Sequence, residues 1–203
     1  DANAAARGEH TYGVARGIDD FIMITLGTGV GSGIISHGRL VYGHDGFAGE
    51  LGHVCVVQDG RQCNCGLKGC LETYASAIGV ARTAREFLQK DSRESLLRRI
   101  DPESISSKDI YDAAVQGDEL AKEIFLYTGR ILGHALGDFV KFSSPQAIVL
   151  FGGLTKSREF FHDEMVRAMN DNLMQIWKDK IQILYSSLKE SDAAILGASS
   201  MVW

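Results

Sequence analysis

The chain has 203 residues, of which 45% are hydrophobic and 23% are charged, so it can bury a sizeable core. Its formal net charge of −5 argues against nucleic acid as a partner of this segment, because a duplex-binding protein needs a basic face. The longest apolar runs are strand-sized and no secretory signal opens the sequence. We therefore expect a cytoplasmic protein with no membrane partner.

The first forty residues predict one helix followed by three strands. Residues 1–10 form an alanine-rich run for which Asp1 is a candidate N-cap. The apolar stretch 20–27 predicts a strand. Residues 27–43 alternate glycines with β-branched residues, which predicts two strands joined by a turn at His37-Gly38.

The middle of the chain predicts a long irregular loop followed by helices. Residues 44–70 are rich in glycine and show no regular period. Helical spacing begins at residues 71–88, and two further helices follow, the second predicted from Asp118 to Phe142.

The last third alternates strands with helices. We predict a buried strand over 145–153, a helix over 158–177, a strand over 181–187 and a closing helix over about 191–203. Strands alternating with helices indicate an α/β layer architecture, and no linker divides the chain.

Three cysteines and a histidine have the spacing of a metal site. Cys63, Cys65 and Cys70 form a C-x-C-x4-C pattern, and His53 precedes it. Three thiolates and one imidazole form a closed tetrahedral zinc set, which leaves no position for a water molecule. We therefore predict a structural zinc ion rather than a hydrolytic one.

The cysteine cluster could also be a disulfide, a redox pair or a group of unligated thiols. A disulfide is disfavoured without a secretory signal, and a thioredoxin-type pair would need C-x-x-C. Reduced cysteines that merely cluster are the plainest alternative to zinc. Cys55 fits no ligand set, and we expect it to be a small buried residue on a short strand.

Two glycine turns could approach a nucleotide. Gly27, Thr28 and Gly29 follow a predicted strand, and glycine allows a backbone to approach phosphate closely. Neither a Walker A loop nor a Rossmann fingerprint is present, and a plain hairpin turn is as good an interpretation. Gly152 and Gly153 likewise follow a strand, where a nucleotide base could lie or where the chain simply turns.

Carboxylates at three positions could bind a polyol. Glu50 and Glu72 bracket the cysteine stretch and could accept hydrogen bonds from hydroxyl groups, although either could instead serve a turn or a helix start. His53 could offer a second ring nitrogen to such a ligand. Asp1 could act as a general base for phosphoryl transfer, or only as a helix cap.

Together these stretches resemble the ROK family of bacterial sugar kinases and sugar-sensing repressors. "GELGHVCVVQDGRQCNCGLKGCLE" is similar to the family signature, "LGTGVGSGII" to its second phosphate loop, and "IVLFGG" to its adenosine turn. "DANAAARGE" resembles the Asn-Asp-x-Asn segment, in which the aspartate is the catalytic base. Asp1 matches that aspartate, but the asparagine before it is missing.

The resemblance implies an actin-like ATPase fold of two ribonuclease-H-like lobes with sugar and nucleotide between them. It assigns hexose hydroxyls to Asp1, Glu50, His53 and Glu72, and zinc to His53, Cys63, Cys65 and Cys70. It assigns ATP-Mg²⁺ to Gly27, Thr28, Gly29, Gly152 and Gly153. Dimers or tetramers are usual in the family.

The family's early Asp-x-Gly-x-Thr phosphate loop is absent from the sequence. We therefore expect residues 1–203 to be the C-terminal lobe, inactive or badly impaired alone, with the zinc and sugar loop at 44–72. The leading hypothesis is the sugar-binding and catalytic lobe of a glucokinase-like, ATP-dependent hexose kinase. The alternative is the sensor lobe of a sugar-responsive repressor, and a zinc-stabilised domain without a ligand is the third.

Overall fold

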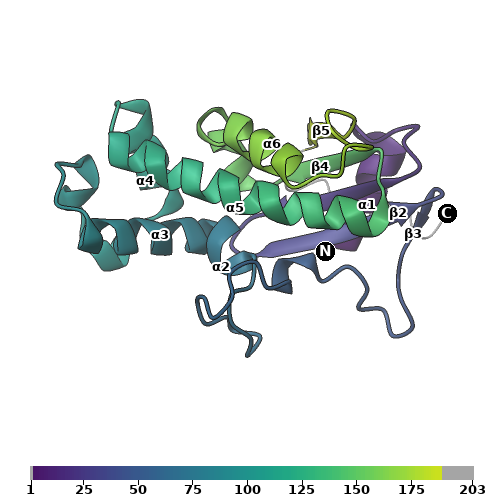
Figure 1. Cartoon of the computed structure of the whole chain (residues 1–203), viewed down its shortest axis with the longest axis horizontal. Coiled ribbons are helices and arrows are strands. Elements are labelled where there is room, and N and C mark those ends of the chain that lie inside the picture. Colours follow the sequence, from purple (N-terminus) through teal and green to yellow (C-terminus); the bar gives the residue numbers. More distant parts are fainter. Residues whose placement is uncertain (1, 189–203) are drawn as a thin grey trace.

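The computed structural model of the chain describes residues 2–188, which form a five-stranded mixed sheet with helices on both faces (Figure 1). The strand order is β3-β2-β1-β4-β5. Strand β2 is antiparallel to both of its neighbours, whereas β1, β4 and β5 are parallel to one another. The predicted α/β class, a mixed sheet with flanking helices, is confirmed.

The sequence pattern located most elements. The strands are β1 (Phe21–Leu26), β2 (Val30–Ser36), β3 (Arg39–Leu40), β4 (Ala147–Phe151) and β5 (Gln182–Tyr185). The α-helices are α1 (Ala2–Tyr12), α2 (Glu72–Ala75), α3 (Ala77–Lys90), α4 (Ser107–Val115), α5 (Glu119–Ser143) and α6 (His162–Asp171). Short 3-10 turns are η1 (Leu51–His53), η2 (Leu96–Arg99), η3 (Pro102–Ser104) and η4 (Gly153–Phe160).

The central strands bury both faces, as continuous apolar runs predict. Along β1, Ile22, Ile24 and Leu26 face the larger core with α3, α5 and α6, whereas Phe21 and Met23 face the opposite side. On that second side the sheet is covered by α1. Alternation along each strand therefore divides one sheet between two cores.

A predicted turn and a predicted helix start are found where the sequence placed them, and the helix predicted from Asp118 to Phe142 is α5. His37 and Gly38 join β2 to β3, and both have positive φ, at 50° and 71°. Asp118 caps α5 by accepting a hydrogen bond from the backbone N–H of Ala121 at 3.0 Å. The local residue types are therefore sufficient to set these boundaries.

Two helical predictions are wrong in part. Residues 71–88 form two helices instead of one, because Ser76 has extended φ and ψ angles of −90° and 167° and caps α3. The stretch predicted as helix over 158–177 begins in the 3-10 turn η4, and its α-helix α6 ends at Asp171. The predicted closing helix over about 191–203 lies outside the described residues.

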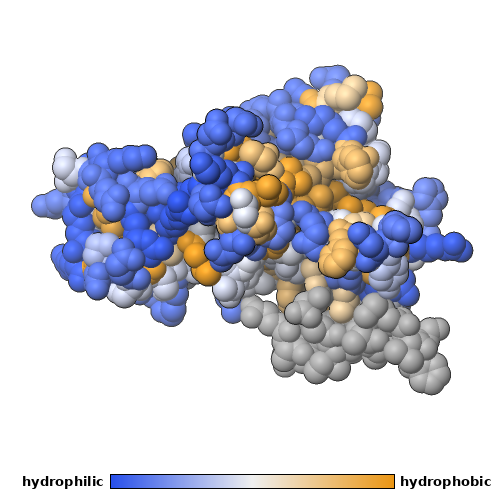
Figure 2. All heavy atoms as spheres, turned by 90° about the horizontal axis from the view of Figure 1, so that it is seen from below, coloured by the Kyte–Doolittle hydropathy of each residue, from blue (hydrophilic) through white to orange (hydrophobic). Residues whose placement is uncertain are grey.

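The surface has a hydrophilic end and an apolar middle. Figure 2 shows the end formed by α3 and α4 as mainly hydrophilic, and hydrophobic side chains gathered in the middle of the face seen from below. Among the described residues, a cavity of about 320 Å³ is lined mainly by apolar side chains, including Ile22, Leu51, Phe139 and Phe142. None of the described helices is both long enough and apolar enough to cross a membrane.

Candidate active site and metal centre

A cavity of about 410 Å³ lies at the carboxyl ends of β1 and β4. These two strands are parallel and in register, with Thr25 opposite Phe151, so the turns that follow them meet at one sheet edge. The predicted Gly27-Thr28-Gly29 turn and the Gly152-Gly153 turn both line the cavity. Ligands in open α/β sheets bind outside such carboxyl ends. Segments more than a hundred residues apart thereby share one cleft.

The conformation of Gly152 explains why glycine is needed there. Its φ is 106°, and a Cβ atom at this position would lie 2.6 Å from the carbonyl oxygen of Leu26. A larger residue would be strained here, both by the backbone angle and by the close approach. The turn after β4 therefore presses its backbone against the end of β1.

Glu72 lines the same cavity from the start of α2. One carboxylate oxygen, Oε2, accepts a hydrogen bond from the backbone N–H of Val30 at 3.0 Å. The other, Oε1, lies 3.9 Å from the sulfur of Cys63. The carboxylate thus stands between the glycine turn and the cysteine cluster, with one oxygen fixed by the backbone of β2.

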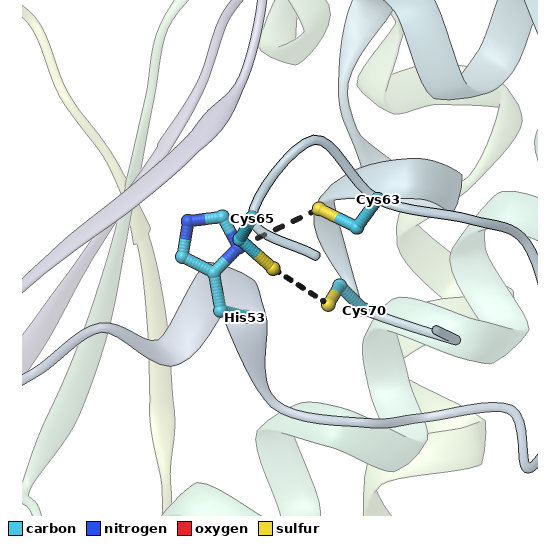
Figure 3. Close-up of side chains that lie close together, drawn as sticks. All are labelled: His53, Cys63, Cys65 and Cys70. Carbon is cyan, nitrogen blue, oxygen red and sulfur yellow. Dashed lines mark hydrogen bonds between the residues drawn. The ribbon is translucent and has the colours of Figure 1, made fainter. Parts of the chain in front are cut away.

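His53, Cys63, Cys65 and Cys70 come together at one point, and their ligand atoms all lie within 4.8 Å of one another (Figure 3). Cys65 and Cys70 have their sulfur atoms 3.6 Å apart, and Nδ1 of His53 is 3.7 Å from the sulfur of Cys63. All four cysteines of the chain are free. Sulfur atoms bonded to one another would be roughly 2 Å apart, so this spacing is not that of a disulfide.

Two of the separations among these four ligand atoms are those expected around a tetrahedral zinc ion. Ligands at roughly 2.0 to 2.3 Å from a tetrahedral metal are about 3.5 to 3.8 Å from one another. The two measured separations, 3.6 and 3.7 Å, fall within that range. In Figure 3 the second ring nitrogen of His53 points away from the sulfur atoms.

The thiols of the cluster differ in acidity. The backbone N–H of Leu67 is the main cause of a lowered pKa at the exposed Cys65. Burial raises the pKa of Cys70 to about 12, and hydrogen bonding to Cys65 and Cys63 adds to this rise. Cys70 would therefore hold its proton at neutral pH unless a cation displaced it, which is the exchange expected at a metal site.

Glu50 is held near the cluster by its backbone but does not line the cavity. Its side chain is exposed, and it precedes the short turn η1 that carries His53. The hydroxyl of Ser32 donates to the carbonyl oxygen of Gly49 and accepts from the N–H of Leu51 at 3.1 Å. Strand β2 thus fixes the backbone on either side of Glu50.

Asp1 lies outside the described residues, but the residue after it is placed. Ala2 begins α1, and its Cβ atom would lie 3.1 Å from a Cβ added to Gly31. Gly31 lines the 410 Å³ cavity. The start of α1 therefore packs against a wall of the cleft.

The expectation of a buried Cys55 is wrong. Its thiol is exposed, although the residue does form an isolated antiparallel bridge with Cys70. In this pair Cys70 is buried and belongs to the group of four that could hold a metal ion, whereas Cys55 is exposed. Cys55 is absent from that group, as expected.

Sequence reasoning missed several residues of the cleft. Thr25, Val30 and Phe151 line the cavity, and the hydroxyl of Thr25 accepts from the N–H of Gly31 at 3.1 Å. Thr25 is the one polar residue in the apolar strand FIMITL, which is a signal that could have found it. Val30 and Phe151 look like ordinary core residues, and nothing local distinguishes them.

Comparison with known proteins agrees with this geometry. A ribonuclease-H-like sheet with a cleft at the ends of β1 and β4 is the architecture of actin-like ATPase lobes, and the ROK family profile matches residues 1–203. The chain belongs to the ROK family.

Relatives include both enzymes and regulators. The chain is 37% identical over 204 residues to a glucokinase of Thermotoga maritima, covering 100% of this chain and 64% of that protein. It is 30% identical over 202 residues to the DNA-binding transcriptional dual regulator NagC of Escherichia coli, covering 100% of this chain and 48% of that protein. The chain thus spans about half to two thirds of the length of these relatives.

A solved structure gives the same fold. A ROK family glucokinase from Streptomyces griseus, in complex with glucose and AMPPNP, superposes with a TM-score of 0.87 at 36% identity. That match covers 98% of this chain and 65% of the other.

Proposed function

We propose that the chain is the sugar-binding and catalytic lobe, residues 1–203, of a glucokinase-like, ATP-dependent hexose kinase in the cytoplasm. The observation that carries the proposal is the 410 Å³ cavity, in which both glycine turns and Glu72 meet. The similarity to glucokinases supports it. ATP and a hexose are the substrates, and no nucleic acid or membrane binds through this segment.

On the nucleotide side, the backbone would do most of the binding. Gly27, Thr28 and Gly29 would approach the phosphates, with the Thr28 hydroxyl as a donor. Gly152 and Gly153 would leave room for the adenosine. Magnesium bound with ATP would neutralise charge on the phosphates during transfer.

On the sugar side, charged acceptors would bind hydroxyl groups. Glu72 has Oε1 free of any backbone donor, so this oxygen can accept from a sugar hydroxyl. Glu50 and the second ring nitrogen of His53 would add contacts, supported by the backbone that Ser32 holds. Asp1, next to Ala2 at the wall of the cleft, would hold the attacking hydroxyl.

The proposed reaction uses these groups as follows. Asp1 would take the proton as the sugar oxygen forms a bond to the γ-phosphorus. The bond from that phosphorus to the oxygen bridging to the β-phosphate would break, and ADP would leave. Holding both substrates in one cleft in the reactive orientation would supply much of the rate advantage.

We propose that His53, Cys63, Cys65 and Cys70 hold a structural zinc ion. Two of their separations are those of a tetrahedral site, and all four ligand atoms lie within 4.8 Å of one another. The ion would supply rigidity to the loop 44–72, and no bond of the substrate would form or break on it.

A coupled assay tests the kinase directly. The full-length protein with ATP-Mg²⁺ should phosphorylate at least one sugar of a panel of glucose, mannose, fructose, allose and N-acetylhexosamines. Asp1→Asn should lower kcat by about 10²-fold or more, since general base catalysis contributes about 10²–10⁴-fold. Asp19→Asn, at an exposed carboxylate with 68% of its side chain accessible, is the matched control and should leave the rate unchanged. An undiminished rate for Asp1→Asn would refute the base assignment.

The second candidate is the sensor lobe of a sugar-responsive repressor. The full-chain similarity to NagC supports it, as does a TM-score of 0.87 to a ROK family transcriptional regulator at 28% identity. Sugar binding without phosphorylation, together with sugar-dependent release of DNA by the full-length protein, would favour this candidate over the kinase.

We also propose a homodimer or homotetramer. The apolar cavity beside Phe142, whose surface is 84% exposed, is consistent with a covered face. Light scattering of the full-length protein tests this, and a monomeric mass would reject it.

A further inference from the structure

Arg61 is a buried arginine in the cysteine loop, only 6% exposed, and all five of its side-chain N–H groups are used. One terminal nitrogen donates to the carbonyl oxygens of Thr73 at 2.6 Å and Gly79 at 3.1 Å. The remaining donors bind the Thr83 hydroxyl at 2.9 Å and both carboxylate oxygens of Glu86, at 2.7 and 3.0 Å.

The break between α2 and α3 explains why these donors are needed. In a continuous helix the N–H of Ala77 would bind the carbonyl oxygen of Thr73, four residues earlier. The extended Ser76 prevents this, and the Ala77 N–H instead donates to the carbonyl oxygen of Gly27 at 2.8 Å. The Thr73 carbonyl is left without its helical partner, and Arg61 replaces it.

A charge and an aromatic ring hold the guanidinium in this position. Its carbon lies 4.3 Å from the centre of the Tyr74 ring, and the Tyr74 hydroxyl accepts from the backbone N–H of Arg61 at 3.0 Å. Burial acts to raise the pKa of Glu86, but the hydrogen bonds from Arg61 and the positive charges of Arg61, Arg82 and Lys90 together outweigh burial, and the pKa is lowered. Glu86 is therefore an anion that matches the buried cation.

Glu72 lies between two attachments. On one side Thr73, the next residue, is bound through its carbonyl oxygen by Arg61. On the other side the cysteine cluster begins at Cys63, two residues after Arg61, and its sulfur is 3.9 Å from Glu72. The side-chain hydrogen bonds of Arg61 all go to α2 and α3, whereas its backbone carbonyl oxygen accepts from the N–H of Gly69 at 2.8 Å. A change of the Arg61 side chain therefore removes no hydrogen bond to the four residues of the cysteine cluster.

We propose that Arg61 is a positioning residue for sugar binding: it fixes the start of α2, and with it the Glu72 carboxylate, against the cysteine loop. This proposal rests on the proposed kinase function and names a residue outside the predicted site. This role requires the planar guanidinium group of arginine, because lysine has the same charge but only three donors, all on one nitrogen.

Arg61→Lys in the full-length protein is the test. We expect the KM for the sugar to rise about 10- to 100-fold, because this is the usual cost of losing a residue that orients a ligand-binding group. The KM for ATP should change less than about twofold. Zinc content should stay at that of the wild type. A merely structural role would not separate the two KM values.

Arg93→Lys is the matched control. Arg93 also forms a forked pair with a carboxylate, Glu123, at 2.6 and 2.8 Å, but it is exposed and follows the far end of α3. The Arg93→Lys variant should therefore keep the wild-type KM for both the sugar and ATP. Folded Arg61→Lys with an unchanged sugar KM would overturn the proposal, and so would equal rises in both KM values.

If Arg61→Lys does not fold, Glu86→Gln decides. This variant removes the ionic partner but leaves Arg61 its two carbonyl acceptors, so the sugar KM should rise by about threefold to tenfold. An unchanged sugar KM would overturn the proposal.

Failure of the kinase proposal is separable from failure of this one. If the wild type phosphorylates no sugar, the kinase proposal fails, and the zinc-loaded wild type and Arg61→Lys are compared by the rate of zinc loss to a chelator. Faster loss from Arg61→Lys would support the role of Arg61 in fixing the loop, and an equal rate would overturn it.

Discussion

The cysteine loop and the two glycine turns lie side by side but obtain their geometry differently. The turns follow β1 and β4, so sheet register and backbone contacts such as that of Gly152 with Leu26 place them. Between η1 and α2 the structure has isolated bridges and loop hydrogen bonds in place of regular strands. Side chains add the contacts of the His53 and cysteine cluster and those of Arg61. We therefore expect the loop to lose its structure when one of these side chains is removed. The turns should instead be disrupted when a side chain is added at a glycine.

The largest effect is expected from Cys70→Ser. Cys70 is fully buried and is a member of the proposed zinc-binding group, so we expect loss of zinc and a fall in the free energy of unfolding by about 3 kcal/mol or more. Metal analysis and chemical denaturation of the full-length protein measure both.

Cys55→Ser is the control for that experiment. Cys55 is exposed and outside the cluster, so the change in the free energy of unfolding should stay within about 0.5 kcal/mol and zinc should remain bound. Similar losses in the two variants would show that the cluster does not hold the loop.

An added methyl group tests the turns. Gly152→Ala should lower the free energy of unfolding by about 1–3 kcal/mol and weaken ATP binding, because it adds a contact at 2.6 Å to a positive φ. Gly17→Ala shares the positive φ, at 78°, but meets nothing within 4 Å, so it measures the backbone strain alone. If both variants lose the same free energy of unfolding, the close contact with Leu26 does not contribute to the effect at Gly152.

The smallest effect concerns Asp118, which is remote from both regions. Burial acts to raise its pKa, but hydrogen bonds from Ala121, Ser95 and Leu96 outweigh burial and lower it from 3.8. Since the folded pKa is depressed, the stabilisation is present above about pH 4 and is lost as the pH falls through the folded pKa.

Asp118→Asn keeps the capping oxygen but does not titrate. Its free energy of unfolding should be about 1 kcal/mol below that of the wild type at pH 6, and the difference should shrink towards pH 3. Urea denaturation at both pH values measures it. A difference independent of pH would reject the assignment to the Asp118 charge.

The sequence predicted what depends on local residue types. The apolar run before Gly27, the turn at His37-Gly38 and the start of the helix at Asp118 each depend on a few neighbouring residues. The C-x-C-x4-C spacing likewise identified residues that the structure brings together.

The remaining features depend on distant partners. Ser76 interrupts a helical pattern because the Ala77 N–H donates to the carbonyl oxygen of Gly27 and Arg61 donates to that of Thr73. Both hydrogen bonds join residues that are far apart in the sequence. The exposed position of Cys55 is likewise set beside a partner fifteen residues away, Cys70, with which it forms an isolated bridge. No periodicity in one segment contains such information.

Glu72 lies between the glycine turn and the cysteine loop. The most direct measurement is therefore the effect of changing Glu72 on the affinity for the sugar. Glu72→Gln has nearly the same shape and can still accept the Val30 hydrogen bond, but it loses the charge. A hydrogen bond to a charged group contributes about 1.5–3 kcal/mol, or about 10- to 100-fold in affinity.

Titration of the full-length protein with glucose, in parallel with ATP, gives the result. We predict a rise of about tenfold or more in the glucose KM for Glu72→Gln, with the ATP KM changed by less than about twofold. An unchanged glucose KM in a folded, zinc-bound variant would contradict the claim that this cleft binds the sugar through Glu72.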